Sequence, residues 1–385
     1  MQYIDPLYGP VELPDYIGEF MESPLLQRLK DISQGVLPQR MVTWPLASRF
    51  EHCVGVCHLM NLALKKSNSK QYEKLLLVSA LLHDAGNPAL SHLCEPFLRK
   101  LTGKDGESFL EDTISKLASL HVFDSLGITS EQIVKMVTGN DKPLSVVLNG
   151  SIDVDNLDNV GRYWFVRSGG EKLFDAEFIA SSFHTLRTDG LIDSEWMLKS
   201  YCIDETKKWQ QARGLVYGKI YGEPDLNAAM MIYRAVYLAQ ELGEITEDFF
   251  HLSDTQAIEY LLTCNEWSTH LAKKTVAHDW YKMIYSVETT EPSSGLLNVA
   301  KFDASRVAVA NYICEQLKVP MGMVCAYTGK GKDLRKITLP FVQPDGSITY
   351  DSSDPKPIYR FKVYIDPEYL HKAESAKLWA KYFIT

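Results

Sequence analysis

Four residues that lie far apart in the sequence have side chains suited to one metal ion: His52, the adjacent pair His83 and Asp84, and Asp155. Two imidazoles and two carboxylates can hold a single divalent metal and leave positions open for water. A site of this kind lowers the pKa of water and neutralises charge on a phosphate. If the four side chains meet in space, the chain is predicted to be a hydrolase.

Each of these residues also has a structural interpretation. A single histidine on a helix is more often a core or surface residue than a ligand, and a single aspartate usually caps a helix. A second pair, His278-Asp279, lacks the flanking pattern, and we interpret it as structural. The pair His83-Asp84 instead follows the most apolar run, residues 75–82. Ionisable groups at such a place are costly to bury unless they are paired or bind a metal.

The elements that must position these residues are predicted to be mainly helical. Turn-forming residues in segment 1–22 indicate a short hairpin or loop before the first helix. Apolar residues at helical spacing predict helices at 23–34, 51–66, 70–84, 88–101, 107–120, 130–138, 153–167, 173–188, 194–213, 225–243, 253–264, 267–285, 303–318 and 367–382.

The C-terminal part has a different pattern. Alternating and β-branched segments predict strands at 323–327, 336–339, 347–350 and 359–364. The segment 289–295 is the best linker candidate. We therefore expect a helical domain over residues 1–288 and an α+β region over residues 289–385, which makes the fold class mainly α.

Composition excludes several classes of partner. The 385-residue chain has a formal net charge of -9, which argues against a broad surface for nucleic acid or an anionic membrane. The seven cysteines are dispersed without a C-x-x-C pair, which is typical of a reducing compartment. The amino terminus shows no signal-peptide pattern, and the longest apolar run is too short to cross a bilayer. We therefore expect a cytoplasmic protein without a membrane partner.

Three sequence strings with fitting gaps resemble those of a known family. The strings are Arg49-Phe50-Glu51-His52-x-x-Gly55, Leu82-His83-Asp84-x-Gly86 and Ile152-Asp153-Val154-Asp155-x-x-Asp158. Together they resemble the HD-domain superfamily of metal-dependent phosphohydrolases, and most closely its deoxynucleoside triphosphate triphosphohydrolase branch (SAM- and HD-domain and dGTPase-like proteins). Weaker matches extend the resemblance over roughly residues 3–265; they are Gln27-Arg28-Leu29, Tyr233-Arg234-x-x-Tyr237 and Leu252-Ser253-Asp254.

The resemblance implies a helical HD bundle and a role for each matching residue. His52, His83, Asp84 and Asp155 would hold one divalent metal, for which manganese, iron, cobalt, zinc and magnesium all remain open. The substrate would be a nucleotide, with (d)NTPs as the best class and nucleoside and triphosphate as products. Homo-oligomerisation is also implied. The expected substrate-binding residues are Arg49 at the phosphates, Gln34 near the sugar, Asn156 at a phosphate, and Arg162 and Tyr237 around the phosphates or base. For Arg162 a helix-surface charge is an equal alternative.

Two positions depart from the family pattern and weaken its acid-base set. Asn87 stands where the family has a histidine, and Lys104 stands where a second histidine is expected. An asparagine cannot act as a general acid, although it can hydrogen-bond a phosphate oxygen. Lys104 can stabilise charge, while His92 and Glu95 are candidates for supplying a proton or positioning water. The chain is therefore either a triphosphohydrolase, an HD-type phosphatase or phosphodiesterase on another nucleotide, or a catalytically weak nucleotide sensor.

One further basic stretch, residues 328–336, contains glycine and is a candidate site for a nucleotide effector. It is not a Walker A sequence, which requires Gly-x4-Gly-Lys-Ser/Thr before a helix. A solvated hairpin turn is the alternative interpretation.

Overall fold

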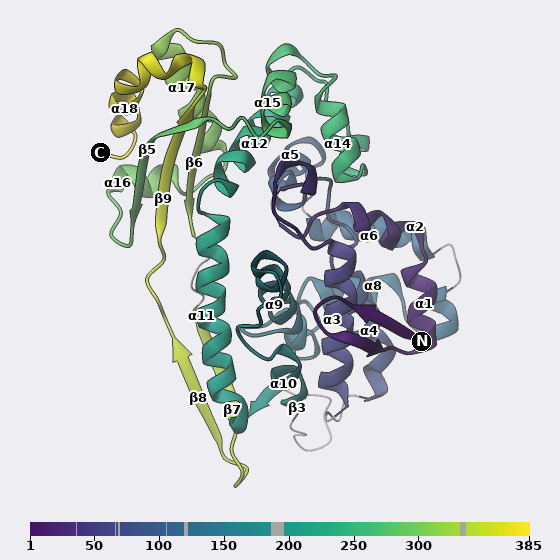
Figure 1. The fold of residues 1–385 in the computed structure, drawn as a ribbon. Helices are drawn as coiled ribbons and strands as arrows, with labels where there is room; N and C mark the ends of the chain where they lie inside the picture. Colours follow the sequence, from purple (N-terminus) through teal and green to yellow (C-terminus); the bar gives the residue numbers. More distant parts are fainter. Residues whose placement is uncertain are drawn as a thin grey trace.

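The computed structural model describes residues 1–35, 37–65, 67, 70–104, 106–118, 122–185, 196–331 and 336–385. Positions 332–335 of the basic stretch therefore lie outside the described residues. The fold is a helical bundle that carries a smaller α+β region at its C-terminal end (Figure 1). The predicted fold class, mainly α with a C-terminal α+β region, is confirmed.

The central helix of the bundle is α3 (Arg49–Leu64), which packs against α4 (Glu73–Leu82), α9 (Val154–Ser168) and α10 (Ala176–Ser181). Almost every side chain of α3 is buried, including those of Arg49, His52 and His58, so its apolar residues are not confined to one face. A capping box fixes where α3 begins. The Ser48 hydroxyl accepts from the Glu51 amide, and the Glu51 carboxylate accepts from the Ser48 amide.

The amino terminus forms the predicted hairpin from β1 (Gln2–Asp5) and β2 (Gly9–Glu12). The short helices α1 (Asp15–Met21) and α2 (Pro24–Arg28) follow, and the Ser23 hydroxyl caps the latter. The other helices of the helical part are α5 (Glu95–Thr102), α6 (Gly106–Ala118), α7 (Val122–Leu126), α8 (Ser130–Val137), α11 (Ile203–Ile220), α12 (Asp225–Glu241), α13 (Glu247–Phe250), α14 (Asp254–Leu261) and α15 (Glu266–Val276).

The α+β region is built on a three-stranded antiparallel sheet of β5 (Lys282–Thr289), β9 (Tyr359–Ile365) and β6 (Val324–Lys330). Helices α16 (Ser294–Val299), α17 (Ala304–Leu317) and α18 (Ala373–Tyr382) pack on it. In Figure 1 this sheet lies at one end of the molecule, and α11 and α12 lie between it and the bundle.

A second sheet joins the two predicted regions. Its strand order is β3 (Phe183–Thr185), β4 (Trp196–Lys199), β7 (Ile337–Val342) and β8 (Ile348–Ser353). Strand β4 pairs in parallel with β7, so residues from either side of the predicted boundary at 288 share one sheet. Strand β5 itself crosses this boundary.

Three predicted helices are wrong in part. The helix expected at 267–285 ends at Val276, and β5 begins at Lys282 after His278 adopts a positive φ of 58°. The helices expected at 173–188 and 194–213 lose residues to β3 and β4. Strand β5 pairs with β9 and strand β4 with β7, both far along the chain, while β3 pairs with β4, the next strand; helical periodicity reports none of these pairings. Among the described residues there is no helix long and apolar enough to cross a bilayer.

Asp254, the first residue of α14, holds together the loops that surround the candidate site. Its carboxylate accepts from the Ser33 amide at 2.9 Å and from the Leu90 amide at 2.8 Å, and Leu90 has a left-handed backbone with φ 62°. Nearby, Arg28 donates to the carbonyls of Asn87 and Leu252. The segment after His83-Asp84 is thus fixed to residues much later in the chain.

Asp254→Asn is expected to change how stability depends on pH. Burial raises the pKa of Asp254 to about 6, even though its two backbone hydrogen bonds act in the opposite direction. Between pH 6 and 4 the folded protein therefore takes up a proton that the unfolded chain does not bind. By linkage, the wild type gains at most about 3 kcal/mol of unfolding free energy as the pH falls through this window, and the variant does not. Urea unfolding at several pH values measures this difference. If the unfolding free energies of the wild type and the variant changed in parallel with pH, the prediction would be contradicted.

Candidate metal and phosphate site

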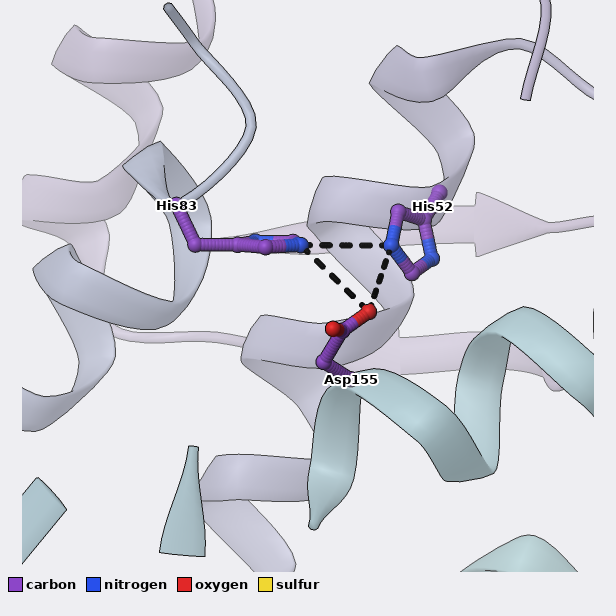
Figure 2. A group of neighbouring side chains, drawn as sticks. All are labelled: His52, His83 and Asp155. Carbon is purple, nitrogen blue, oxygen red and sulfur yellow. Dashed lines mark hydrogen bonds and ion pairs between the residues drawn. The ribbon is translucent and has the colours of Figure 1, made fainter. Parts of the chain in front are cut away.

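His52, His83 and Asp155 point toward one another from three different helical segments (Figure 2). His52 lies on α3, His83 follows α4 and Asp155 lies in the first turn of α9. The Nε2 atoms of the two histidines are 3.2 Å apart. The Oδ1 atom of Asp155 is 3.1 Å from His52 Nε2 and 3.6 Å from His83 Nε2.

The hydrogen bonds at the other ring nitrogens define what these imidazoles offer to a ligand. His83 Nδ1 lies 2.8 Å from the Ala80 carbonyl, which only accepts, so this nitrogen carries a proton. His52 Nδ1 likewise donates to Asp158 Oδ1 at 2.7 Å. In their neutral forms both rings therefore direct an Nε2 lone pair at the same point. Two lone pairs and a carboxylate oxygen repel one another at this spacing unless a cation lies among them. The donor set fits a divalent metal.

Asp84 adds a second carboxylate to this group. Its Oδ2 lies 3.6 Å from the Nε2 atom of both histidines. The same oxygen accepts a hydrogen bond from Arg49, whose Nε donates to Ser91 Oγ at 2.8 Å. Arg49 is the first residue of α3 and is almost wholly buried. Its guanidinium is thus held beside the carboxylates rather than extended into solvent.

The pKa values of His83 and Asp155 are shifted by the side chains around them. Burial disfavours a charge on His83, but Asp84 and Asp155 outweigh it and raise the pKa of His83 well above its usual value. The pKa of Asp155 is well below its usual range, because its hydrogen bonds with His52 and His83 overcome the effect of burial. The point between these side chains therefore attracts positive charge, whether a proton or a metal ion.

A buried network of ion pairs contacts His52 at its Nδ1 atom. Asp158 makes a bidentate pair with Arg162, at 2.9 Å to Nε and 2.8 Å to Nη2, and Arg162 also donates to both carboxylate oxygens of Asp5. None of these three side chains has exposed surface. Burial acts to raise the pKa of Asp158, but Arg162 and His52 lower it, so Asp158 is an ionised acceptor for the His52 ring. Gly55 leaves the room that this pair requires.

Two cavities meet at the site. One, of about 490 Å³, reaches toward the α+β region and is called here the aromatic cavity because Tyr163, Tyr217, Tyr221 and Tyr327 line it. The other, of about 400 Å³, is called the polar cavity because Asn87, Asn149, Asp153 and Asn156 line it. Both are lined by the same five side chains at their junction: Asp84, His92, Glu95, Arg99 and Asp155.

Most of the predicted site residues line these cavities. Gln34 lies in the aromatic cavity and donates to Asn159 Oδ1 at 3.2 Å. His92 is exposed at the junction, and its Nδ1 is 2.7 Å from Glu95 Oε1. Asn87 lines the polar cavity with a buried Nδ2 that has no hydrogen-bond partner among the described residues. Asn156 lines the same cavity and accepts from Arg213 Nη1 at 2.7 Å.

Three predicted site residues lie elsewhere. Arg162 is fully buried in the network described above, so it lines neither cavity and is not a helix-surface charge either. Its role is to position Asp158. Lys104 is half-buried and pairs with Asp112 rather than lining a cavity. Tyr237, on α12, accepts from Asn311 at 3.4 Å and lies beneath Arg234, away from both cavities.

Sequence reasoning missed other residues. Asp158 ends the third sequence string that resembles the family. Its position one helical turn after Asp155 indicates that both side chains lie on the same face of the helix. Arg99 follows Glu95 by one turn and is detectable by the same rule. Arg306 and Tyr327 come from the α+β region, and no local pattern links them to the site. Asp153, by contrast, caps α9 through the Asn156 amide, in agreement with the preference for Asp155 as the ligand.

Comparison with known proteins finds several sequence relatives, and no family model matches the chain. The chain is 28% identical over 188 residues to a deoxynucleoside triphosphate triphosphohydrolase SAMHD1 homolog of Dictyostelium discoideum, an alignment covering 43% of this chain and 36% of the relative. It is 31% identical over 133 residues to the SAMHD1 enzyme of Danio rerio, covering 32% and 20%. An uncharacterised protein of Methanocaldococcus jannaschii is 27% identical over 260 residues, covering 67% and 54%. The chain thus spans between a fifth and about half of these relatives.

Solved structures share the fold over the whole chain. A hypothetical protein from Aquifex aeolicus has a TM-score of 0.75 at 18% identity and covers 98% of this chain and 99% of its own. A phosphohydrolase from Bacteroides thetaiotaomicron has a TM-score of 0.72 at 17% identity, covering 95% and 99%. The α+β region is therefore part of a fold that also occurs in distant sequences.

Gly55→Ala is expected to disrupt the site indirectly. A Cβ at this position would lie 2.0 Å from Asp158 Oδ2 and 2.2 Å from Arg162 Nη2, so the buried pair must separate. We expect a loss of about 3 kcal/mol of stability, measured by urea unfolding. Because Asp158 orients His52, metal affinity should fall roughly 10- to 100-fold in a titration followed by calorimetry.

Gly218→Ala is the matched control, since Gly218 is also helical but has no atom near its Cβ direction within 4 Å. Alanine there should leave metal affinity unchanged and add about 0.5–1 kcal/mol of stability through helix propensity. Equal behaviour of the two variants would show that Gly55 does not support the site.

Proposed function

We propose that the chain is a metal-dependent nucleotide phosphohydrolase of the HD-domain superfamily, which its partial similarity to SAMHD1 proteins supports. The best substrate class is the (d)NTPs, which would be split into nucleoside and triphosphate. One observation carries the proposal: His52, His83, Asp84 and Asp155 converge beside Arg49, where two cavities meet. A cytoplasmic location, homo-oligomerisation and a nucleotide effector, which the sequence led us to expect, belong to the same proposal.

The four ligand side chains would hold one divalent ion, which when bound supplies Lewis-acid charge for a phosphate oxygen and for water. Asp158 keeps the His52 ring oriented, and the Ala80 carbonyl does the same for His83. Arg49 contributes a fixed positive charge at the position where a phosphate must approach. Arg99, exposed at the junction, offers a second guanidinium that suits phosphate oxygens.

Proton transfer is assigned to His92 and Glu95. The imidazole of His92 is exposed at the junction, within 2.7 Å of Glu95, and both side chains line both cavities. In this arrangement Glu95 orients the ring and His92 donates a proton to the departing oxygen. Asn87 contributes a hydrogen bond through its unpartnered amide donor, but no proton.

The character of the two cavities supports attack between the nucleoside and the phosphates. Tyrosine rings along the aromatic cavity suit a sugar and base, while amides along the polar cavity suit phosphate oxygens. When the sugar and base lie in the aromatic cavity and the phosphates lie in the polar cavity, the bond to be cleaved lies beside the metal ligands at the junction. Release of a monophosphate, diphosphate or single phosphate would instead correspond to an HD-type phosphatase or phosphodiesterase.

A second candidate function is a catalytically weak nucleotide sensor. The observation that favours it is the depleted acid-base set, in which Asn87 replaces a histidine and the Lys104 amine pairs with Asp112 outside both cavities. Such a protein would bind metal and nucleotide, and it would respond by assembling or by binding a partner rather than by releasing product.

Metal-stripped protein that is resupplied with single metals is expected to release nucleoside and triphosphate from at least one (d)NTP. The panel consists of manganese, iron, cobalt, zinc and magnesium with mixed NTPs and dNTPs, and products are separated by chromatography. Asp84→Ala should lower the rate more than about 100-fold, because it removes a ligand and the partner of Arg49. Asp279→Ala is the matched control, since it alters the other His-Asp pair at an exposed position and should have no effect.

Asn87→His is expected to raise kcat by roughly tenfold or more, because it adds an acid-base group to the polar cavity. The matched control is Asn149→His, which places an imidazole elsewhere in the same cavity and should not raise kcat. Lys104→His should add little, because Lys104 pairs outside the cavities. Steady-state nucleoside release measures all three. High wild-type turnover that falls in Asn87→His would show that the missing histidine does not limit the reaction.

A further inference from the structure

The aromatic cavity ends against the α+β region. Its lining begins at the metal-binding group, with His52 and Asp155, and reaches Arg306 of α17 and Tyr327 of β6 at the opposite end. The cavity therefore takes its lining from the helical part, from α11 and α12, and from the α+β region, which Figure 1 shows on the far side of these two helices from the bundle. A ligand whose phosphates lie at the metal group must direct its other end toward Arg306.

We propose that Arg306, supported by Tyr327, is a specificity-determining residue that recognises the base of the nucleotide. This inference rests on the proposed function, because it takes the phosphates to be at the metal group. Nothing in the matched sequence strings points to Arg306, which lies outside the stretch that resembles the family.

Arg306 is held in one orientation. Its Nε donates to the Thr328 carbonyl at 3.1 Å, and its Nη2 is 2.9 Å from Asp303 Oδ1. The guanidinium carbon lies 4.9 Å from the centre of the Tyr327 ring and 5.5 Å from that of Tyr233. Only 17% of the Arg306 side chain is exposed. A guanidinium fixed in this way loses little entropy when it binds a ligand.

The fixed contacts leave donors for a ligand. Arginine carries five N–H donors in a planar fork, and the contacts to Thr328 and Asp303 use only part of them. Because Arg306 lines the cavity, the remaining donors are available to acceptor atoms of a base. Tyr217 and Tyr221 also line the cavity, and because Arg213 lies over the first ring and Arg360 over the second, each ring has at most one face on which a base can stack.

Arg306 lines the cavity together with a carboxylate, while the exposed Lys330 adds a further positive charge at the same end. The carboxylate is that of Asp303, which offsets the positive charge of Arg306. A second anionic group would meet this carboxylate, whereas a base edge presents both acceptors and donors to the pair. Bases differ in where these groups lie, so a rigid Arg306–Asp303 pair discriminates among them.

The test compares affinities of the manganese-loaded protein for non-hydrolysable analogues of the four dNTPs, measured by equilibrium dialysis. We expect the wild type to bind its preferred base roughly tenfold or more tightly than the poorest, and Arg306→Met to reduce that ratio to about threefold or less. Arg306→Lys keeps the charge and the apolar stem but loses the fork, so it should show the same reduction. Thermal unfolding of both variants establishes that they fold.

Lys330→Met is the matched control, because Lys330 is an exposed cation that lines the same end of the cavity. It should weaken binding of all four analogues by one common factor and preserve the ratio. Equal weakening across the four bases in the Arg306 variants, or an unchanged ratio, would overturn the inference. Base-dependent binding of the analogues, together with no product from the corresponding hydrolysable dNTPs, would sink the proposed hydrolysis but leave the role of Arg306 standing. An absence of nucleotide binding by the wild type would overturn both.

Discussion

The guanidinium of Arg162, closed between Asp5 and Asp158, is the interaction on which the geometry of the site depends. It connects the N-terminal hairpin to α9 and holds Asp158 in the position where it accepts from His52. A buried network of this kind is costly to break, because removal of one partner leaves an unpaired charge without water. The orientation of His52 is therefore set by residues that never contact a ligand.

The two arginines near His52 are each held by carboxylates, and Arg162 is shared between Asp5 and Asp158. Arg49 pairs with Asp84. Asp155, which is partly exposed at the junction of the cavities, has no lysine or arginine partner among the described residues. The Asp155 carboxylate is thus located where the Nε2 atoms of His52 and His83 also point. This combination, rather than the presence of any single ligand type, makes the position suitable for a divalent cation.

The sequence predicted the bundle well, and it named the side chains that the structure brings together at the candidate metal site, because both leave local signals. Helical periodicity marked α3 and α9, and the apolar run before His83 marked a buried end. The strand β4 and the role of Arg162 were not predictable in this way. The pairing of β4 with β7 joins distant segments, and the burial of Arg162 depends on contact with Asp5, which lies 157 residues earlier in the chain. Such features follow from tertiary contacts, which a single sequence does not report.

The two ends of the aromatic cavity are under different physical constraints. At the metal end, a change to any ligand leaves a lone pair or a carboxylate uncompensated, so the chemistry permits few alternatives. At the opposite end, Arg306 and Tyr327 are carried by α17 and β6, and replacing them removes contacts without unbalancing the metal group. A fold arranged in this way can keep one reaction while the α+β region changes which nucleotide is accepted. Substrate choice in this chain is therefore best sought at the wall of the cavity rather than among the metal ligands.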